Sequence, residues 1–357
     1  MEFGMFHEFQ WSPGQSETAA FAQSFEQVDA AERWGLDAMW LAELHIAPHR
    51  SVLSAPLAVG AAIAARTSRI KIGTAVQVLP LCHPLRLAEE AATVDHISRG
   101  RLIFGVGRSG FPRTYEAYGI PYAESRERFS EVLAIVQLAW TEERFSYQGK
   151  YHSFDKVSLV PKPYQKPHPP IRIAATSADT YPVIGALGHP IFVAARIGTL
   201  SELAPLVRSY RAAYRAAGHP GEGEVYLRVP VYVAETAERA RDEPEESLMR
   251  LYRQTGAGLE GSAKTAKALT TEERELAERA ERAARAERLQ NVTYEEALRD
   301  KIIVGTPGQV TDRLRELREE LGLDGILAEH NGGSLIPHAL VMNALRLLCE
   351  EVMPHFE

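Results

Sequence analysis

The chain has 357 residues, of which 45% are hydrophobic and 24% are charged, and a net charge of −7, a composition typical of a globular protein. The acidic balance argues against a nucleic-acid-binding surface, and no run of about 18 apolar residues predicts a membrane span. Two distant cysteines, Cys82 and Cys349, favour a reducing compartment, and without a basic N-terminal segment we expect no signal peptide. The sequence therefore predicts a cytoplasmic protein.

Strand-like and helix-like segments alternate along the chain. Short apolar strands are predicted at residues 3–6, 36–41, 70–78, 102–104, 170–175, 191–194, 225–233 and 325–328. Helices are predicted at 16–34, 54–65, 84–97, 123–140, 177–187, 201–217, 236–252, from a capping box at Thr306 onward, and at 336–352. Strands that alternate with helices pair in parallel, with the helices outside. Eight such units predict an α/β fold of the closed (β/α)8, or TIM-barrel, type.

Two segments interrupt this alternation. Residues 143–161 predict an inserted β-hairpin, and residues 254–291 form a second insertion between the seventh and eighth strands. The second insertion is rich in Glu, Arg and Ala with opposite charges four residues apart, which favours helix. It is either a solvated helical excursion or a mobile lid near the barrel mouth. We expect residues 1–357 to form a single barrel domain that carries both insertions.

A glycine-rich loop follows the fourth strand. Gly105, Gly107 and Gly110 have the G-x-G-x-x-G spacing, which binds dinucleotides only where the third glycine opens a helix. The residues from Gly110 to Pro121 contain two prolines and no apolar periodicity, so we expect no helix there. The alternative is a strand end that presents backbone and the cation of Arg108 to an anionic ligand.

Active sites of (β/α)8 barrels lie at the C-terminal ends of the strands. The third and fourth strands end in small side chains, which suits a flat aromatic ligand. After the fifth strand, Thr176, Ser177 and Thr180 precede a helix. Their hydroxyl and N–H groups, with Arg108 as countercharge, could bind a phosphate, or Thr176 or Ser177 could simply cap the helix.

The loop after the second strand contains Glu43, His45 and His49. These three residues could ligate a metal, but Pro48 interrupts the helix that would bring both imidazoles to one face, and no matching ligands follow later strands. We therefore expect no metal site. His45 is either a catalytic histidine or an ordinary packing residue.

Several segments, in order, resemble the bacterial luciferase-like flavin monooxygenases. They are MEFGMF, GLDAMWLAELH, IGTAVQVLPLCHPLRLAEE, DHISRGRLIFGVGR, IVGTPGQV and LAEHNGG with LRLLCEEVMP, and they cover nearly the whole chain apart from the charged insertion. The family has a (β/α)8 barrel. The resemblance implies FMN at the barrel mouth, with its phosphate at Arg108 and the loop of Thr176, Ser177 and Thr180. It also implies a non-prolyl cis peptide between Ala75 and Val76 beneath the isoalloxazine.

The resemblance further implies a reaction. Reduced FMN from a separate FMN reductase would react with O₂ to a C4a-hydroperoxide, which oxygenates a small substrate such as an aldehyde or another carbonyl compound. Glu43 and His45 match the family's acidic residue and second histidine, so His45 would act in acid–base chemistry. Leu44 replaces luciferase's catalytic histidine and Gly107 replaces its reactive cysteine, which argues against light emission.

Two further expectations follow from the resemblance. A homodimer is expected, and the insertion at 254–291 stands in the place of the family's mobile active-site loop, which favours the lid. Two other functions fit the same barrel: a dehydrogenase that uses the deazaflavin F420, and a non-catalytic flavin-binding partner subunit. Retained Arg108 and His45 argue against the non-catalytic alternative.

Overall fold

Eight parallel strands close into a barrel in the computed structural model, which describes residues 1–195, 198–267 and 273–356. The barrel strands are β1 (Glu2–His7), β2 (Ala38–Leu41), β3 (Lys71–Thr74), β5 (Leu102–Gly107), β8 (Ile171–Ala174), β9 (Ile191–Ala194), β10 (Val225–Val233) and β12 (Gly325–Glu329). Pairing of β12 with β1 and of β9 with β10 closes the ring. The predicted (β/α)8 fold is confirmed.

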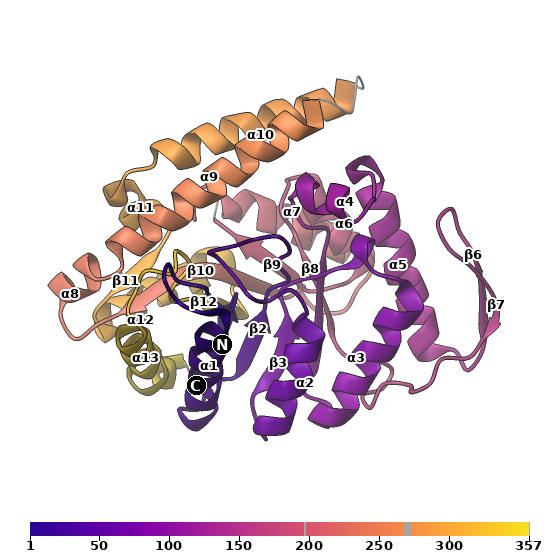
Figure 1. The fold of residues 1–357 in the computed structure, drawn as a ribbon, viewed down its shortest axis with the longest axis horizontal. Coiled ribbons are helices and arrows are strands. Elements are labelled where there is room, and N and C mark those ends of the chain that lie inside the picture. Colours follow the sequence, from indigo (N-terminus) through magenta and orange to yellow (C-terminus); the bar gives the residue numbers. More distant parts are fainter. Residues whose placement is uncertain (196–197, 268–272, 357) are drawn as a thin grey trace.

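Helices surround the barrel, as Figure 1 shows. They are α1 (Glu17–Arg33), α2 (Pro56–Arg66), α3 (Pro84–Ser98), α4 (Pro112–Ala117), α5 (Ser125–Thr141), α6 (Thr180–Leu187), α7 (Leu203–Ala216), α8 (Ala237–Asp242), α11 (Tyr294–Asp300), α12 (Pro307–Leu321) and α13 (His338–Leu347). The predicted capping box is present at α12, where Thr306 and Gln309 bond reciprocally. Among the described residues, no helix is both long and apolar enough to cross a membrane.

Some local predictions are wrong. The segment after Gly110 does contain a helix, α4, because Pro112 at its first position presets the helical φ and the fully buried Tyr115 anchors it. The third predicted strand is broken after Thr74 and resumes as β4 (Gln77–Val78), which pairs with β5. A short strand that the sequence did not predict, β11 (Ile303–Gly305), extends the sheet beside β10.

The lower half of the barrel interior is filled by Trp40, which is fully buried. A Cβ atom at Gly4 or Gly73 would collide with its indole, so the neighbouring strands need glycine at these positions. Arg172 pairs with Glu2 at 2.7 Å in the same interior. These side chains fill that part of the barrel interior.

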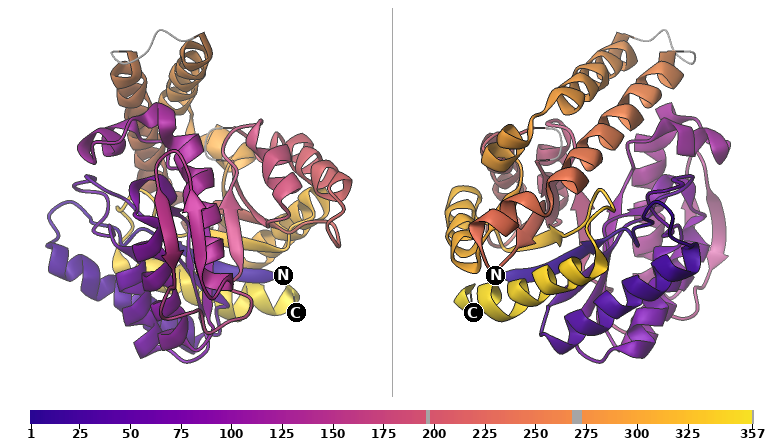
Figure 2. Two further views of the ribbon diagram at one scale, coloured as in Figure 1. Left: turned by 90° about the vertical axis from the view of Figure 1, so that its right-hand side faces the viewer. Right: turned by 60° about the vertical axis from the view of Figure 1, so that its left-hand side comes forward.

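Both predicted insertions are present. The β-hairpin consists of β6 (Phe145–Gln148) and β7 (Ser153–Val157). The helical insertion is a pair of antiparallel helices, α9 (Glu245–Lys267) and α10 (Glu273–Asn291), whose outer half projects beyond the barrel (Figures 1 and 2). It begins earlier than predicted, because Pro244 separates α8 from α9 within the helix expected at 236–252. Whether the pair moves as a lid stays a prediction.

Candidate active site

Strand alternation divides the upper layer of the barrel interior into two halves. Successive residues of a strand face opposite sides of the sheet. The residue that lies two positions after an interior side chain, toward the C-terminal end of the strand, therefore also faces the barrel interior. On one side this layer holds small residues: Ala42, Ala75, Gly105, Ala174 and Ala194. On the other side it holds the charged residues Glu8, Arg228 and Glu329. The mouth therefore has a flat, small-residue half and a charged half.

The floor of the small-residue half lies where β3 meets β5. The peptide bond between Ala75 and Val76 is cis, as the family resemblance implied, and Thr74 Oγ1 donates to the Gly105 carbonyl at 2.6 Å. A Cβ atom at Gly107 would lie 2.6 Å from Val76 Cγ2. Val76 thus occupies the space that a side chain at position 107 would need.

A cationic edge borders this floor. Arg108 Nη1 donates to Ser125 Oγ at 3.0 Å, at the start of α5, while the Arg108 carbonyl accepts from Tyr115. The next residue, Arg126, reaches the loop after β8 and pairs with Asp179 at 2.9 Å. Through Ser125 and Arg126 the structure brings Arg108 to the predicted phosphate loop. Sequence reasoning missed Arg126, because nothing in the first turn of a helix marks one arginine as facing a loop 53 residues away.

The phosphate loop is held by its own hydrogen bonds. Ser177 Oγ donates to Asp179 Oδ1 at 2.6 Å, and Thr180 Oγ1 donates to the Ser177 carbonyl at 2.6 Å, while Thr176 lies exposed beside them. Asp179 takes the N-cap position of α6 without a side-chain cap bond, so the alternative that Thr176 or Ser177 caps this helix is wrong. Partial burial opposes ionisation of Asp179, but the hydrogen bond from Ser177 and the charge of Arg126 lower its pKa overall. An anion therefore already sits against Arg126.

An acid–base chain lies beside the floor. Glu43 Oε2 accepts from Gln77 Nε2 at 2.6 Å and from the Val78 N–H at 2.7 Å, and Glu43 Oε1 lies 2.7 Å from His45 Nε2. Because Glu43 serves as an acceptor, His45 Nε2 carries its proton. With this tautomer, Tyr118 Oη donates a hydrogen bond to His45 Nδ1, 2.9 Å away. Sequence reasoning missed Tyr118, which comes from the loop after β5 and lies 73 residues from His45.

The pKa of Tyr118 suits this role as a donor. Burial, together with the negative charge of Glu43, raises the pKa of Tyr118, so its phenol stays protonated.

Burial also raises the pKa of the Cys82 and Cys349 thiols to about 12, which leaves neither cysteine reactive. His49 does not join His45 but stacks on Trp11 with ring centroids 5.0 Å apart. In the described part of the chain, no group of three or more His, Cys, Asp or Glu residues could hold a metal ion.

The charged half of the mouth is a network of ion pairs. Arg50 holds Glu8 through both carboxylate oxygens, at 2.9 and 2.7 Å. Arg228 bridges the two acids: its Nη2 lies 2.9 Å from Glu329 Oε2 and 3.4 Å from Glu8 Oε1. Both carboxylates are buried. The sequence did not predict this network, because its members come from parts of the chain that are far apart and meet only when the barrel closes.

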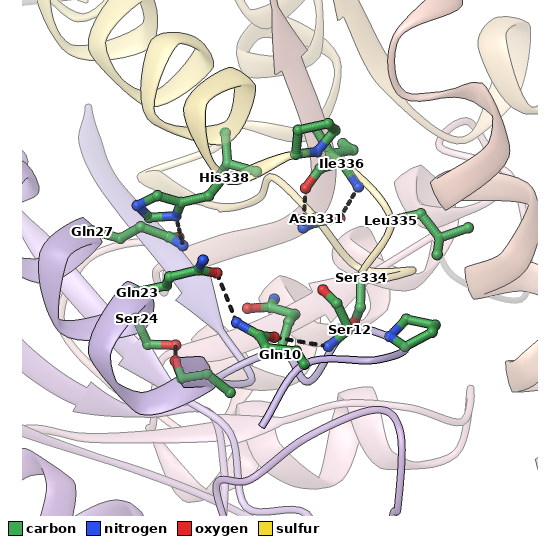
Figure 3. A pocket seen from close by; sticks show the side chains of 15 residues that line it. Gln10, Ser12, Gln23, Ser24, Gln27, Asn331, Ser334, Leu335, Ile336 and His338 are labelled. Carbon is green, nitrogen blue, oxygen red and sulfur yellow. Dashed lines mark hydrogen bonds between the residues drawn. The ribbon is translucent and has the colours of Figure 1, made fainter. Parts of the chain in front are cut away.

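A separate hollow of about 370 Å³ opens between α1 and the loops after β1 and β12, and Figure 3 shows its lining. The lining is polar and mostly uncharged, with side chains that include Gln10, Ser12, Gln23, Ser24, Gln27, Asn331, Ser334 and His338. Strands β1 and β12 lie across the barrel from β5 and β8. None of the predicted flavin-site residues lines this hollow.

Comparison with known proteins decides the family. A model of the luciferase-like monooxygenase family matches residues 1–325. The chain belongs to this family. The resemblance inferred from its motifs is thereby confirmed, and the protein is an oxidoreductase of the monooxygenase class.

Three relatives illustrate the range of the luciferase-like family. The oxygenase component of the flavin-dependent trigonelline monooxygenase of Acinetobacter baylyi is 26% identical over 361 residues, which cover 100% of this chain and 96% of that protein. The structure of monooxygenase RslO1 from Streptomyces bottropensis is 26% identical, with a TM-score of 0.82 and 100% of both chains covered. The oxygenating constituent of 3,6-diketocamphane monooxygenase from Pseudomonas putida, solved with FMN, is 21% identical, covers 100% of this chain and 99% of its own, and has a TM-score of 0.79. This last likeness shows the fold alone.

Proposed function

We propose that this luciferase-like protein is a monooxygenase that binds reduced FMN at the barrel mouth and oxygenates a small carbonyl compound. The observation that carries the proposal is the order of parts around the mouth. A floor of small residues at Ala75, Val76 and Gly107 lies between the cationic edge at Arg108 and the acid–base chain at His45. With the isoalloxazine ring on this floor, the phosphate of FMN would lie at Arg108, and His45 would supply a proton on the opposite side.

The residues present fit FMN. Arg108 and Arg126 supply cations. The hydroxyl of Ser177 would turn from Asp179, and that of Thr180 from the Ser177 carbonyl, to donate to a bound phosphate. The glycine at position 107 keeps bulk off the floor. Reduced FMN, when bound, would supply the electrons that activate O₂. The relation to the flavin-dependent trigonelline monooxygenase supports a flavin cofactor.

The chain itself contributes proton control and a covered site. Glu43 keeps the proton of His45 on Nε2 and stabilises the imidazolium that forms when Nδ1 takes a proton. Tyr118, bonded to that Nδ1, connects the imidazole to the mouth. Helix α9 lies close to the loop after β5, since a Cβ atom at Gly258 would lie 3.4 Å from Phe111. This cover would exclude water from the reacting group.

Two partners are part of the proposal. The name of the trigonelline enzyme describes an oxygenase component, which supports a separate reductase that supplies reduced FMN. We also propose a homodimer, on the family resemblance alone. Sedimentation of the purified protein would test the dimer, and a monomer at micromolar concentration would contradict it.

Binding and turnover test the proposed function together. The purified protein is titrated anaerobically with reduced FMN and, separately, with the reduced deazaflavin F420. It is then supplied with O₂, an FMN reductase and a panel of aldehydes and ketones. We expect reduced FMN to bind and one oxygenated product to form for each carbonyl compound consumed. Binding of the deazaflavin alone would establish the dehydrogenase, and FMN binding without consumption of any carbonyl compound would establish a non-catalytic flavin-binding protein.

A further inference from the structure

One carboxylate oxygen in the charged half of the mouth has no hydrogen-bond partner in the described part of the chain. Glu329, the last residue of β12, is 2% exposed, and its Oε2 accepts from Arg228 Nε at 3.1 Å and Nη2 at 2.9 Å. Its Oε1 is buried and, among the described residues, has no hydrogen-bond partner. A buried carboxylate oxygen without a donor is costly. Glu329 Oε1 is therefore suited to accept a hydrogen bond from a bound molecule.

The nearby cations are bonded elsewhere. Arg50 bonds both oxygens of Glu8, Arg228 bridges Glu8 and the other oxygen of Glu329, and Lys301 donates to the Gly198 carbonyl. Each of these side chains has a fixed acceptor, so none is directed at Glu329 Oε1. The oxygen remains an acceptor beside an otherwise balanced network.

Glu329 lines a small cavity at the mouth. Arg228 and Lys301 line it from the barrel side, and Leu251 and Tyr252 of α9 close it from above. Its volume of about 10 Å³ is room for roughly one water molecule. A group that takes the place of this water is therefore about as small as a hydroxyl or an amino group.

A glycine lies directly against the oxygen. A Cβ atom at Gly332 would lie 2.5 Å from Glu329 Oε1 and 2.7 Å from Leu251 Cδ2, so any side chain there would crowd both residues. The backbone of Gly332 does not have a positive φ, so backbone conformation does not require glycine at this position. What requires glycine here is the close approach of the Glu329 carboxylate and Leu251.

We propose that Glu329 Oε1 accepts a hydrogen bond from a small O–H or N–H group of the substrate, at the end remote from the reacting carbonyl. The proposal rests on the proposed function in placing the substrate at the barrel mouth. A substrate with such a group satisfies the oxygen. A substrate with an ether or methyl group there leaves the carboxylate unpaired, and sites of this kind reject such analogues strongly. The enzyme therefore selects hydroxylated or aminated carbonyl compounds.

Matched ketones test the selection without turnover. The protein loaded with oxidised FMN is titrated with 4-hydroxycyclohexanone, 4-aminocyclohexanone and 4-methoxycyclohexanone, and binding is followed by calorimetry. We expect the hydroxyl and amino compounds to bind about tenfold or more tightly than the methoxy compound, as a hydrogen bond to a charged acceptor predicts. Equal affinity of the three ketones, or binding of none, would overturn the proposal.

Two variants locate the effect at the oxygen. In Glu329→Gln, Arg228 holds the amide oxygen, so the amide NH₂ replaces Oε1 and turns the acceptor into a donor. We expect the preference for the hydroxyl compound over the methoxy compound to be lost, because the hydroxyl oxygen and the ether oxygen can both accept from the amide NH₂. Gly332→Ala adds a methyl group beside Oε1 without a change of charge, and we expect it to abolish the preference. Glu319→Gln, on the exposed face of α12, is the matched control and should keep the wild-type order.

The outcomes separate this proposal from the proposed function. If FMN binds and carbonyl compounds are oxygenated but Glu329→Gln leaves the order of the ketones unchanged, only the donor-recognition proposal fails. If the preference for the hydroxyl compound is lost in Glu329→Gln while no carbonyl compound is ever oxygenated, the recognition proposal stands and the proposed reaction fails. Thermal unfolding of each variant confirms that it is folded before binding is compared.

Discussion

Asp179 lies where the phosphate of FMN would approach Arg126. Its carboxylate already pairs with that arginine and accepts from Ser177, so it competes with the ligand for the same donors. We predict that Asp179→Asn tightens the binding of reduced FMN severalfold by removing like-charge repulsion. Anaerobic fluorescence titration measures the dissociation constant, and weaker binding in the variant would mean that Asp179 orients the loop for the phosphate.

Arg108 provides the opposite test at the same edge. We predict that Arg108→Ala weakens the binding of reduced FMN by about 1.5–3 kcal/mol, the usual loss for a hydrogen bond to a charged group. Arg113→Ala is the control, because Arg113 is an exposed cation of α4 only a few residues away. If both variants bind FMN as the wild type does, Arg108 has no part in the phosphate site.

Gly107 and Val76 form a complementary pair in the floor. We predict that Gly107→Cys lowers the free energy of unfolding by about 1–3 kcal/mol, as overpacking does, because its Cβ atom would lie 2.6 Å from Val76 Cγ2. Val76→Ala should restore most of this loss in the double variant. Urea unfolding of the four proteins gives the coupling free energy, and purely additive losses would show that the two residues do not compete for space.

These residues also show the limit of reasoning from sequence. Position after a strand was enough to propose Glu43, His45, Arg108 and Ser177 as candidates, because strand ends meet at the mouth of any barrel. It did not select Tyr118, whose partner His45 lies 73 residues away. Such contacts depend on how loops fold over the mouth.

At the scale of elements, prediction succeeded where periodicity was strong. Strands β9 and β10 have the predicted bounds, Ile191–Ala194 and Val225–Val233. The short helix α4 and the three-residue strand β11 were missed, because a proline-started turn of six residues and a brief edge pairing leave too little periodic signal. The helix expected at 236–252 is divided at Pro244, since proline lacks the N–H that a continuous helix needs.

Helices α9 and α10 are the elements best placed to respond to a ligand. Arg250 of α9 donates to the carbonyls of Gly333 and His49, at 3.0 and 3.3 Å, and Gly258 faces Phe111. If the pair acts as a lid, bound FMN should slow amide hydrogen exchange in the first half of α9. Mass spectrometry with and without FMN measures this, with the β6–β7 hairpin as the segment expected not to change. Identical exchange in α9 would contradict the lid.

At the scale of the whole molecule, buried histidines link stability to pH. Burial lowers the pKa of His7 and of His330 to about 4. Between this value and the ordinary 6.5 the unfolded chain binds protons that the folded chain does not, so stability is complete above pH 6.5 and falls as the pH drops towards 4. We predict a loss of roughly 2 kcal/mol per histidine between pH 7.5 and pH 5.

Urea unfolding at the two pH values measures this loss. His330→Gln should reduce the difference in unfolding free energy between pH 7.5 and pH 5. His355→Gln, which changes an exposed histidine near the C-terminal end of the described chain, should leave the difference as it is in the wild type. An unchanged difference in His330→Gln would mean that His330 is not held neutral by burial.

Trp40 gives the molecule an optical property that follows from its place in the barrel. Its indole is 0% exposed, and among the described residues its Nε1 has no hydrogen-bond partner, so its fluorescence should lie at the short-wavelength end of the tryptophan range. It is one interior layer below the floor of the mouth. A flavin on that floor would quench this emission by energy transfer. The indole that fills the barrel can therefore report occupancy of the mouth without an added label.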